Sequence, residues 1–126
     1  MGPYQGEVFM SGDTLTIDGK EIKILTETDP TQLPWKSLSV DSVVEASGKF
    51  TKKVDAQKHC AAGAKRVLIS APSQDADATI IMGVNQDQFN KETDKIVSLG
   101  SCTTNALVPV LDVLQKTFGV ESAYMT

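Results

Sequence analysis

The chain has 126 residues, of which 40% are hydrophobic and 22% charged, a composition typical of a globular protein of one domain. Its formal net charge is −4 and it contains no block of basic residues, so binding to nucleic acid through a cationic patch is not expected. No apolar run approaches the ~18 residues of a membrane span and no signal peptide is visible, so we expect no membrane partner.

The N-terminal part is predicted to form a small antiparallel meander with a structural role. Residues 5–10, 14–17 and 20–26 have the character of short strands. Asp18-Gly19, between two of them, is a strong hairpin signal. A loop bracketed by two prolines follows, and we expect Trp35 at its end to pack in the interior rather than bind a ligand.

Residues 40–46 predict a buried parallel strand, with Ser47, Gly48 and Phe50 just beyond its carboxyl end. Ligands of open parallel sheets lie at that end of the strands, and glycine lets the backbone approach a ligand closely. The residues by themselves also fit a plain strand-to-helix turn.

A helix is predicted over 52–62, with Thr51 as its N-cap and Gly63 at its C-terminal end. His59 and Cys60 are neighbours on this helix and therefore point in different directions. We place Cys60 in the core and His59 at the surface, and we expect no metal site. The two cysteines of the chain lack the spacing of a disulfide framework, which indicates reduced thiols and a cytoplasmic location.

Three further strands are predicted over 65–69, 79–82 and 96–99. The first ends in Ser70-Ala71-Pro72, and Asn85 is expected to cap a turn after the second. From Thr103 to Phe118 apolar residues recur every three or four positions, which predicts a helix with one buried face, containing Pro109 and ending at Gly119. Residues 120–126 are predicted to begin another strand.

The junction between the strand at 96–99 and this helix contains Cys102. Ser101 is a good N-cap, and the unpaired N–H groups of a first helical turn favour a thiolate over a thiol. A lone cysteine is more often inert and buried. The polar residues around it, Ser101, Thr103, Thr104 and Asn105, together with free N–H groups, are suited to bind an oxyanion or a phosphate. The pattern therefore predicts an activated cysteine nucleophile.

The pentapeptide SCTTN, at residues 101–105, resembles the active-site signature of glyceraldehyde-3-phosphate dehydrogenase, and the resemblance extends from Tyr4 to Thr126. It implies an α/β chain: a partial Rossmann-like sheet, doubly wound and mostly parallel, with a small antiparallel meander at the N-terminus. Residues 1–100 would be the second half of the NAD-binding domain, and 101–126 the start of the catalytic domain, packed as one unit. No G-x-G-x-x-G occurs, so we expect an internal fragment of the family.

The resemblance also assigns roles. It implies Cys102 as the catalytic nucleophile and Asn105 as its support, with Ser101 and Thr103 binding phosphate. The cofactor-binding residues that it implies are Ser47, Gly48, Phe50, Ser70 and Ala71. Thr28 stands where the family has an arginine near the cofactor, and that contact is not carried over; Ala46 replaces a usual serine.

The implied chemistry is oxidation of glyceraldehyde 3-phosphate with NAD and inorganic phosphate through a cysteine thioester, in a homo-oligomer. The sequence leaves open the choice between NAD and NADP. The family's catalytic histidine is not matched by His59, so we expect this chain alone to be inactive. The alternatives are an erythrose-4-phosphate dehydrogenase and a non-catalytic folded fragment. An uncovered sheet edge predicts that the chain dimerises, swaps elements or aggregates.

Overall fold

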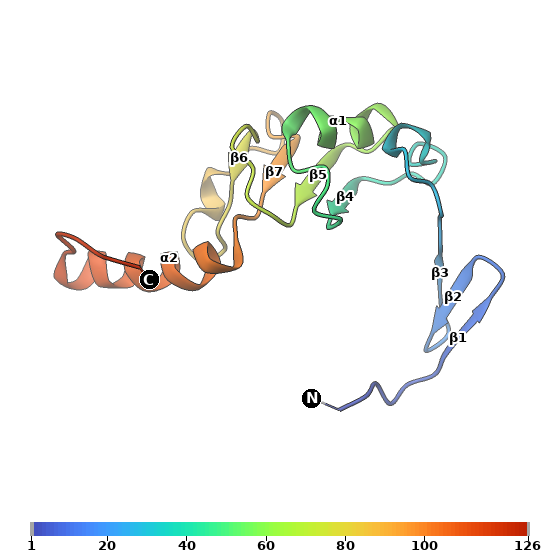
Figure 1. The fold of residues 1–126 in the computed structure, drawn as a ribbon, viewed down its shortest axis with the longest axis horizontal. Helices are drawn as coiled ribbons and strands as arrows, with labels where there is room; N and C mark the ends of the chain where they lie inside the picture. The colour runs from blue at the N-terminus through green and yellow to red at the C-terminus, as the bar shows by residue number, and fades with distance from the viewer. Residues whose placement is uncertain (1, 126) are drawn as a thin grey trace.

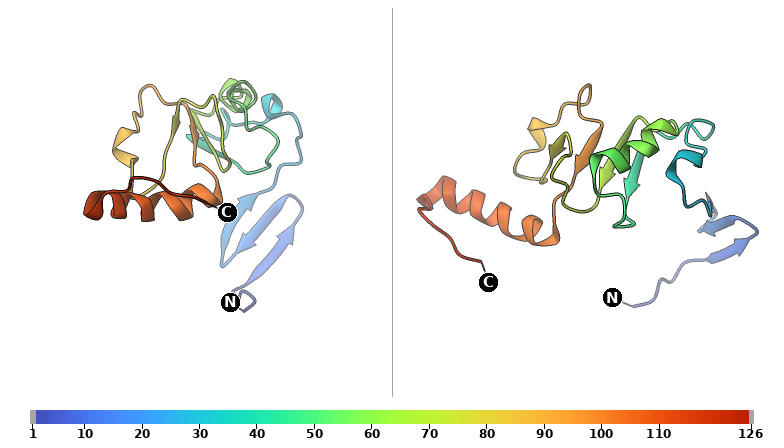
Figure 2. Two further views of the ribbon diagram at one scale, coloured as in Figure 1. Left: turned by 60° about the vertical axis from the view of Figure 1, so that its left-hand side comes forward. Right: turned by 45° about the horizontal axis from the view of Figure 1, so that its top comes forward.

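The computed structural model describes residues 2–125, which form an antiparallel sheet, a parallel sheet and two α-helices (Figure 1). The antiparallel sheet is the predicted meander, in the order β1-β2-β3. Its strands are β1 (Val8–Ser11), β2 (Thr14–Ile17) and β3 (Lys20–Lys23). Asp18-Gly19 joins the last two strands, as predicted. The meander lies apart from the parallel sheet in each of the views (Figures 1 and 2).

The second sheet has the order β4-β5-β7-β6, and each neighbouring pair is parallel. Its strands are β4 (Ser42–Glu45), β5 (Arg66–Ile69), β6 (Ala78–Thr79) and β7 (Ile96–Ser98). A parallel sheet requires crossover connections, and α1 (Lys53–Ala61) is the one between β4 and β5. The partial Rossmann-like sheet with its meander is therefore confirmed.

The core lies between α1 and the parallel sheet. It is formed by small and β-branched residues of the strands, of α1 and of the loop between α1 and β5: Val43, Ala56, Ala64, Val67, Ile69 and Ile96. Trp35 and Cys60 are half-buried against this core, in agreement with their predicted packing roles. β4 buries only alternate residues, with Val44 61% exposed, so the expectation of a fully buried strand was wrong.

Three local predictions in this region need correction. The N-cap of α1 is Lys52 rather than Thr51, because Asp75 in a distant loop accepts the Lys53 N–H at 3.0 Å and supplies the missing cap. Strand β6 is two residues long and ends at Thr79. Asn85 is the N-cap residue of the short helix η2 (Gln86–Gln88), as predicted, but its side chain makes no capping bond: it bonds the Ile81 N–H and the Thr79 carbonyl instead.

Helix α2 (Cys102–Phe118) begins and ends where the sequence predicts, with Ser101 as N-cap, Pro109 inside and Gly119 as C-cap. None of its residues is buried, so the predicted buried face is wrong for this chain. No described helix or strand packs closely against α2, and only part of its apolar stripe, at Leu107, Val108 and Leu111, is half-buried. Residues 120–125 form no strand, so the strand predicted there is wrong for these residues, and Thr126 lies outside the described residues. None of the helices in the described range has the length and apolar character to cross a bilayer.

Candidate active site at the carboxyl edge of the parallel sheet

The carboxyl ends of β4, β5 and β7 meet at one edge of the sheet, because the three strands run parallel. The segment after β4 contains Ser47, Gly48 and Phe50. The segment after β5 begins with Ser70 and Ala71, and the segment after β7 leads into α2 (Figure 1). The topology therefore brings the predicted cofactor-binding residues and the turn between β7 and α2, called the cysteine turn below, to the same edge.

Cys102 is the first residue of α2, and its side chain is exposed. The Ser101 hydroxyl accepts the Thr104 N–H at 2.9 Å and lies 2.7 Å from the Thr104 hydroxyl, so it caps the first turn. The N–H groups of Cys102 and Thr103 belong to this turn, where the helix supplies no acceptors and the helix dipole is positive. An accessible sulfur therefore lies beside donors that can bind an anion.

Asn105 holds the turn that precedes the helix. Its side-chain N–H groups donate to the carbonyl of Leu99 at 2.7 Å and to the carbonyl of Ser101 at 2.9 Å. These bonds link the last residues after β7 to the first turn of α2. The amide therefore fixes the backbone from which Cys102 projects.

Ser98 links the cysteine turn to the segment after β5. Its side chain is fully buried, donates to the Ala71 carbonyl at 2.9 Å and accepts the Gly100 N–H at 3.1 Å. Gly100 is packed tightly as well, because a Cβ atom there would lie 2.9 Å from the Ile81 side chain. Ser98 was not among the predicted site residues, although a hydroxyl at the end of an otherwise apolar strand was a signal that could have indicated it.

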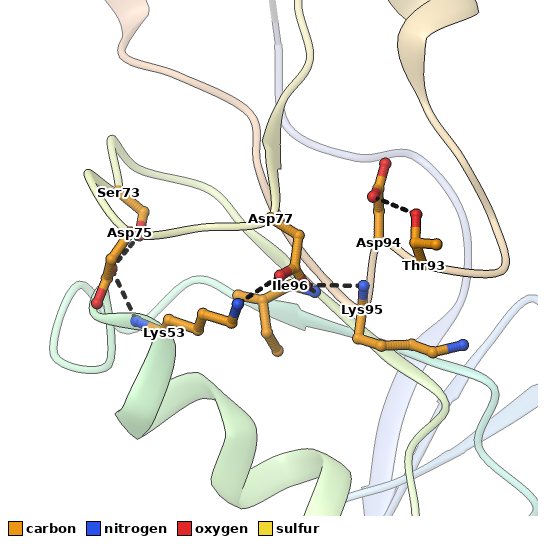
Figure 3. A network of polar contacts seen from close by, with 8 residues as sticks. All are labelled: Lys53, Ser73, Asp75, Asp77, Thr93, Asp94, Lys95 and Ile96. Atoms are coloured by element: carbon orange, nitrogen blue, oxygen red, sulfur yellow. Dashed lines mark hydrogen bonds and ion pairs between the residues drawn. The ribbon is translucent and has the colours of Figure 1, made fainter.

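Asp77 fixes the other end of the segment after β5 (Figure 3). One carboxylate oxygen lies 2.5 Å from the ammonium of Lys53, and the other accepts the N–H groups of Lys95 and Ile96 at 2.9 and 2.8 Å. Burial by itself raises the pKa of the Asp77 carboxyl, but Lys53 and the two N–H donors outweigh it and leave the pKa below its usual value. Asp77 thus ties the segment to α1 and β7.

Ser47 and Gly48 form a tight turn after β4. The backbone N–H and the hydroxyl of Ser47 both donate to Oε1 of Glu45, at 2.8 and 2.5 Å, and the hydroxyl accepts the Lys49 N–H at 3.1 Å. Gly48 has φ +73°, a conformation that favours glycine, and no atom lies within 4 Å of the place a Cβ would take. The Ser47 hydroxyl shapes the turn, while the Gly48 backbone is open to a ligand.

His59 is buried rather than at the surface, which corrects the sequence prediction. Its Nε2 lies 3.1 Å from Oε2 of Glu45, and its Nδ1 accepts the Trp35 indole N–H at 3.0 Å. The Phe50 ring and the imidazole form a T-shaped pair, with ring centroids 6.3 Å apart. The missed signals were positional: Glu45 alternates with buried Val43 along the strand, and His59 follows buried Ala56 by three residues on the helix.

Comparisons with known proteins agree with the resemblance. The glyceraldehyde-3-phosphate dehydrogenase of Streptomyces coelicolor is 50% identical over all 126 residues, and glyceraldehyde-3-phosphate dehydrogenase 2 of Bacillus subtilis is 50% identical over 125. The family model described as "Glyceraldehyde 3-phosphate dehydrogenase, NAD binding domain" matches residues 1–53, and the C-terminal domain model matches 101–126. This chain belongs to the glyceraldehyde-3-phosphate dehydrogenase family.

Members of the glyceraldehyde-3-phosphate dehydrogenase family extend well beyond the segment present here. The chain spans 38% of the Streptomyces relative and 37% of that from Thermotoga maritima, which is 44% identical over 123 residues. The match to the NAD-binding model includes the Ser47–Phe50 turn, and the C-terminal match begins at Ser101.

The residues present fit the dinucleotide NAD. A hollow of about 540 Å³ lies between the segment after β4 and the segment after β5, within the usual size range for small-molecule sites. It is lined by Thr51, Lys52, Pro72, Ser73, Gln74 and Asp75. The open backbone of Gly48 and the exposed Ser70 lie on the segments that border it. Residues 2–125 contain no group of three or more side chains able to hold a metal ion.

Proposed function

We propose that this chain carries the cofactor loops and the nucleophilic cysteine of an NAD-dependent glyceraldehyde-3-phosphate dehydrogenase. The observation that carries the proposal is the position of Cys102. It is exposed at the first residue of α2, close to the sheet edge where the segments after β4 and β5 begin. Residues 1–100 would then be the second half of the NAD-binding domain and 101–126 the start of the catalytic domain.

The proposed chemistry begins at the sulfur of Cys102. The thiolate attacks the aldehyde carbon of glyceraldehyde 3-phosphate, and the carbonyl electron pair becomes an oxyanion. N–H groups of the first turn of α2 stabilise this charge. Bound NAD would accept the hydride from the resulting thiohemiacetal. Inorganic phosphate, held by Ser101 and Thr103, would then release the acyl group from sulfur.

The remaining assignments concern positioning. Asn105 holds the turn from which Cys102 projects, as its two hydrogen bonds indicate. Ser47, Gly48, Phe50, Ser70 and Ala71 would border the dinucleotide, with Gly48 and Ser70 making direct contacts and Ser47 shaping the turn. Glycolysis in the cytoplasm, a reducing compartment, is consistent with two free thiols. The uncovered apolar face of α2 supports assembly into a homo-oligomer.

A second candidate, cofactor binding and thiol reactivity without turnover, is favoured by the state of His59. Both nitrogens of this imidazole are engaged, one by Trp35 and one by Glu45, so it is not free to act as a base for Cys102. We therefore expect the 126-residue chain to form no NADH in repeated turnovers. Its cysteine should still react with electrophiles.

Alkylation of the two thiols tests the proposal. The chain is treated with iodoacetamide at neutral pH, and peptide mass spectrometry follows Cys102 and Cys60 separately, with and without NAD. Burial raises the pKa of the Cys60 thiol, so Cys60 is a matched slow reference. We expect Cys102 to react at least about tenfold faster than Cys60, and we expect NAD to change the rate of Cys102 but not that of Cys60. Equal rates for the two thiols, with no effect of NAD, would overturn the proposal.

A further inference from the structure

A buried polar chain connects the core to the turn at Gly48. It begins at the Trp35 indole, passes through His59 of α1 and Glu45 at the end of β4, and reaches Ser47. His59 and Glu45 are only 5% and 6% exposed. Three segments far apart in the sequence thus meet at two titratable side chains that have no part in the proposed chemistry.

The hydrogen bonds assign the tautomer of His59. An indole N–H can only donate, so Nδ1 of His59 must accept the bond of 3.0 Å from Trp35. The proton of the neutral imidazole is then on Nε2, which donates to Oε2 of Glu45 over 3.1 Å. Trp35 therefore ensures that His59 presents a donor to the carboxylate.

Glu45 divides its two oxygens between the core and the turn. Oε2 faces His59, while Oε1 accepts both the N–H and the hydroxyl of Ser47. Burial raises the pKa of the Glu45 carboxyl, but the bonds from Ser47 and His59 together outweigh burial, so the pKa lies below its usual value and the group stays ionised. With both oxygens engaged, the carboxylate cannot rotate without losing charge-assisted hydrogen bonds.

The turn is fixed on both sides of Gly48. Ser47 is held by Glu45, and Lys49 donates its N–H to the Ser47 hydroxyl at 3.1 Å. Gly48 itself has open space around it. A buried carboxylate adds little net stability compared with a packed apolar side chain, so its contribution here is the direction of its acceptors.

We propose that His59 and Glu45 are positioning residues for the dinucleotide, acting through Ser47 to hold the Gly48 backbone in the shape that contacts the cofactor. This proposal rests on the proposed function for its ligand. Its structural part, that His59 orders the turn through Glu45, stands on the hydrogen bonds alone.

Two substitutions of His59 separate positioning from packing. In His59→Gln the amide nitrogen takes the place of Nε2 and keeps a donor for Glu45. In His59→Asn the shorter amide lies near the place of Nδ1 and leaves Oε2 without its donor. Both variants introduce a neutral amide, so they are matched controls for each other.

Amide hydrogen exchange of the 126-residue chain, followed by NMR, is the decisive readout. We expect His59→Asn to accelerate exchange at Ser47 and Lys49 by about tenfold or more, as loss of a charge-assisted hydrogen bond implies. The core amides of Val67 and Leu99, bonded to Lys95 and Ile69, should keep their rates. His59→Gln should restore the slow exchange. Unchanged rates at Ser47 and Lys49 in His59→Asn would overturn the proposal, as would equal acceleration of the core amides.

Two further measurements complete the test. A long-range proton–nitrogen spectrum should show the His59 proton on Nε2, and a proton on Nδ1 would contradict the proposal. Calorimetric titration with NAD should show about tenfold weaker binding to His59→Asn than to His59→Gln. No binding to the parent chain would refute the proposed function, while the exchange rates still decide whether His59 orders the turn. Equal affinity in both variants would refute the role toward the cofactor.

Discussion

Replacing Ser98 by alanine removes a single oxygen atom, but it should destabilise the chain strongly because that oxygen makes two buried hydrogen bonds. The side chain is fully buried and its hydroxyl makes two hydrogen bonds, to the Ala71 carbonyl at 2.9 Å and from the Gly100 N–H at 3.1 Å. Ser98→Ala removes both and leaves a donor and an acceptor unpaired at the base of the site. Each such loss costs about 1–3 kcal/mol when the group is buried.

The two orphaned groups differ in their access to water. Gly100 is buried, whereas Ala71 is half-buried, so water can replace part of the bond to its carbonyl. We therefore expect a loss of about 2–4 kcal/mol in the free energy of unfolding, which is a large share of the ~5–15 kcal/mol typical of a domain. The same change should loosen the contact between the segment after β5 and the cysteine turn.

Urea unfolding followed by the fluorescence of Trp35 measures the loss directly. Ser101→Ala is the control, because it removes an N-cap worth about 1 kcal/mol in a half-exposed position of the same segment. If the unfolding free energy of both variants depends on urea concentration with the same slope, the shifts in their urea midpoints report changes in stability. A loss below about 0.5 kcal/mol in Ser98→Ala, or one smaller than in Ser101→Ala, would refute the argument.

Three further predictions concern other parts of the chain. The pKa of Glu45 is lower in the folded state than its usual 4.5, so its stabilising contribution is present above that value and is lost as the pH falls through the folded pKa. Glu45→Gln should flatten the decrease of the urea midpoint below about pH 4.5, and an unaltered pH profile would contradict this. Asp77→Asn should lower the unfolding free energy by about 1–3 kcal/mol in the same assay, since it weakens the bonds to Lys53 and two N–H groups; a neutral effect would show that Asp77 does not fasten the segment after β5. Val113 on α2 is 61% exposed in an uncovered apolar face, so Val113→Glu should reduce self-association in sedimentation experiments, and a parent chain that is monomeric at high concentration would refute that expectation.

Features encoded by neighbouring residues could be predicted from the sequence. Ser101 caps α2 and Gly119 ends it because cap chemistry depends on a few adjacent positions. The parallel order of the strands follows from the family resemblance, and it places the predicted site residues at one edge. Their roles toward cofactor and substrate stay predictions.

Features that depend on distant residues could not be predicted. Asp75 caps α1 from 22 positions away, which displaced the expected role of Thr51. His59 is polar and lies on a helix, so only its contacts with Glu45 and Trp35 explain its burial. The periodicity of α2 correctly indicated an apolar stripe, but periodicity does not tell whether a partner covers it.

The central claim is that the segments after β4, β5 and β7 form one site at the carboxyl edge of the sheet. Titration of the isotope-labelled 126-residue chain with NAD, followed through its backbone amide signals, tests it most directly. We expect shifts that saturate with a single dissociation constant at Gly48, Ser70 and Cys102, and none in the meander of β1, β2 and β3. The absence of saturable shifts, or shifts confined to residues away from this edge, would contradict the claim.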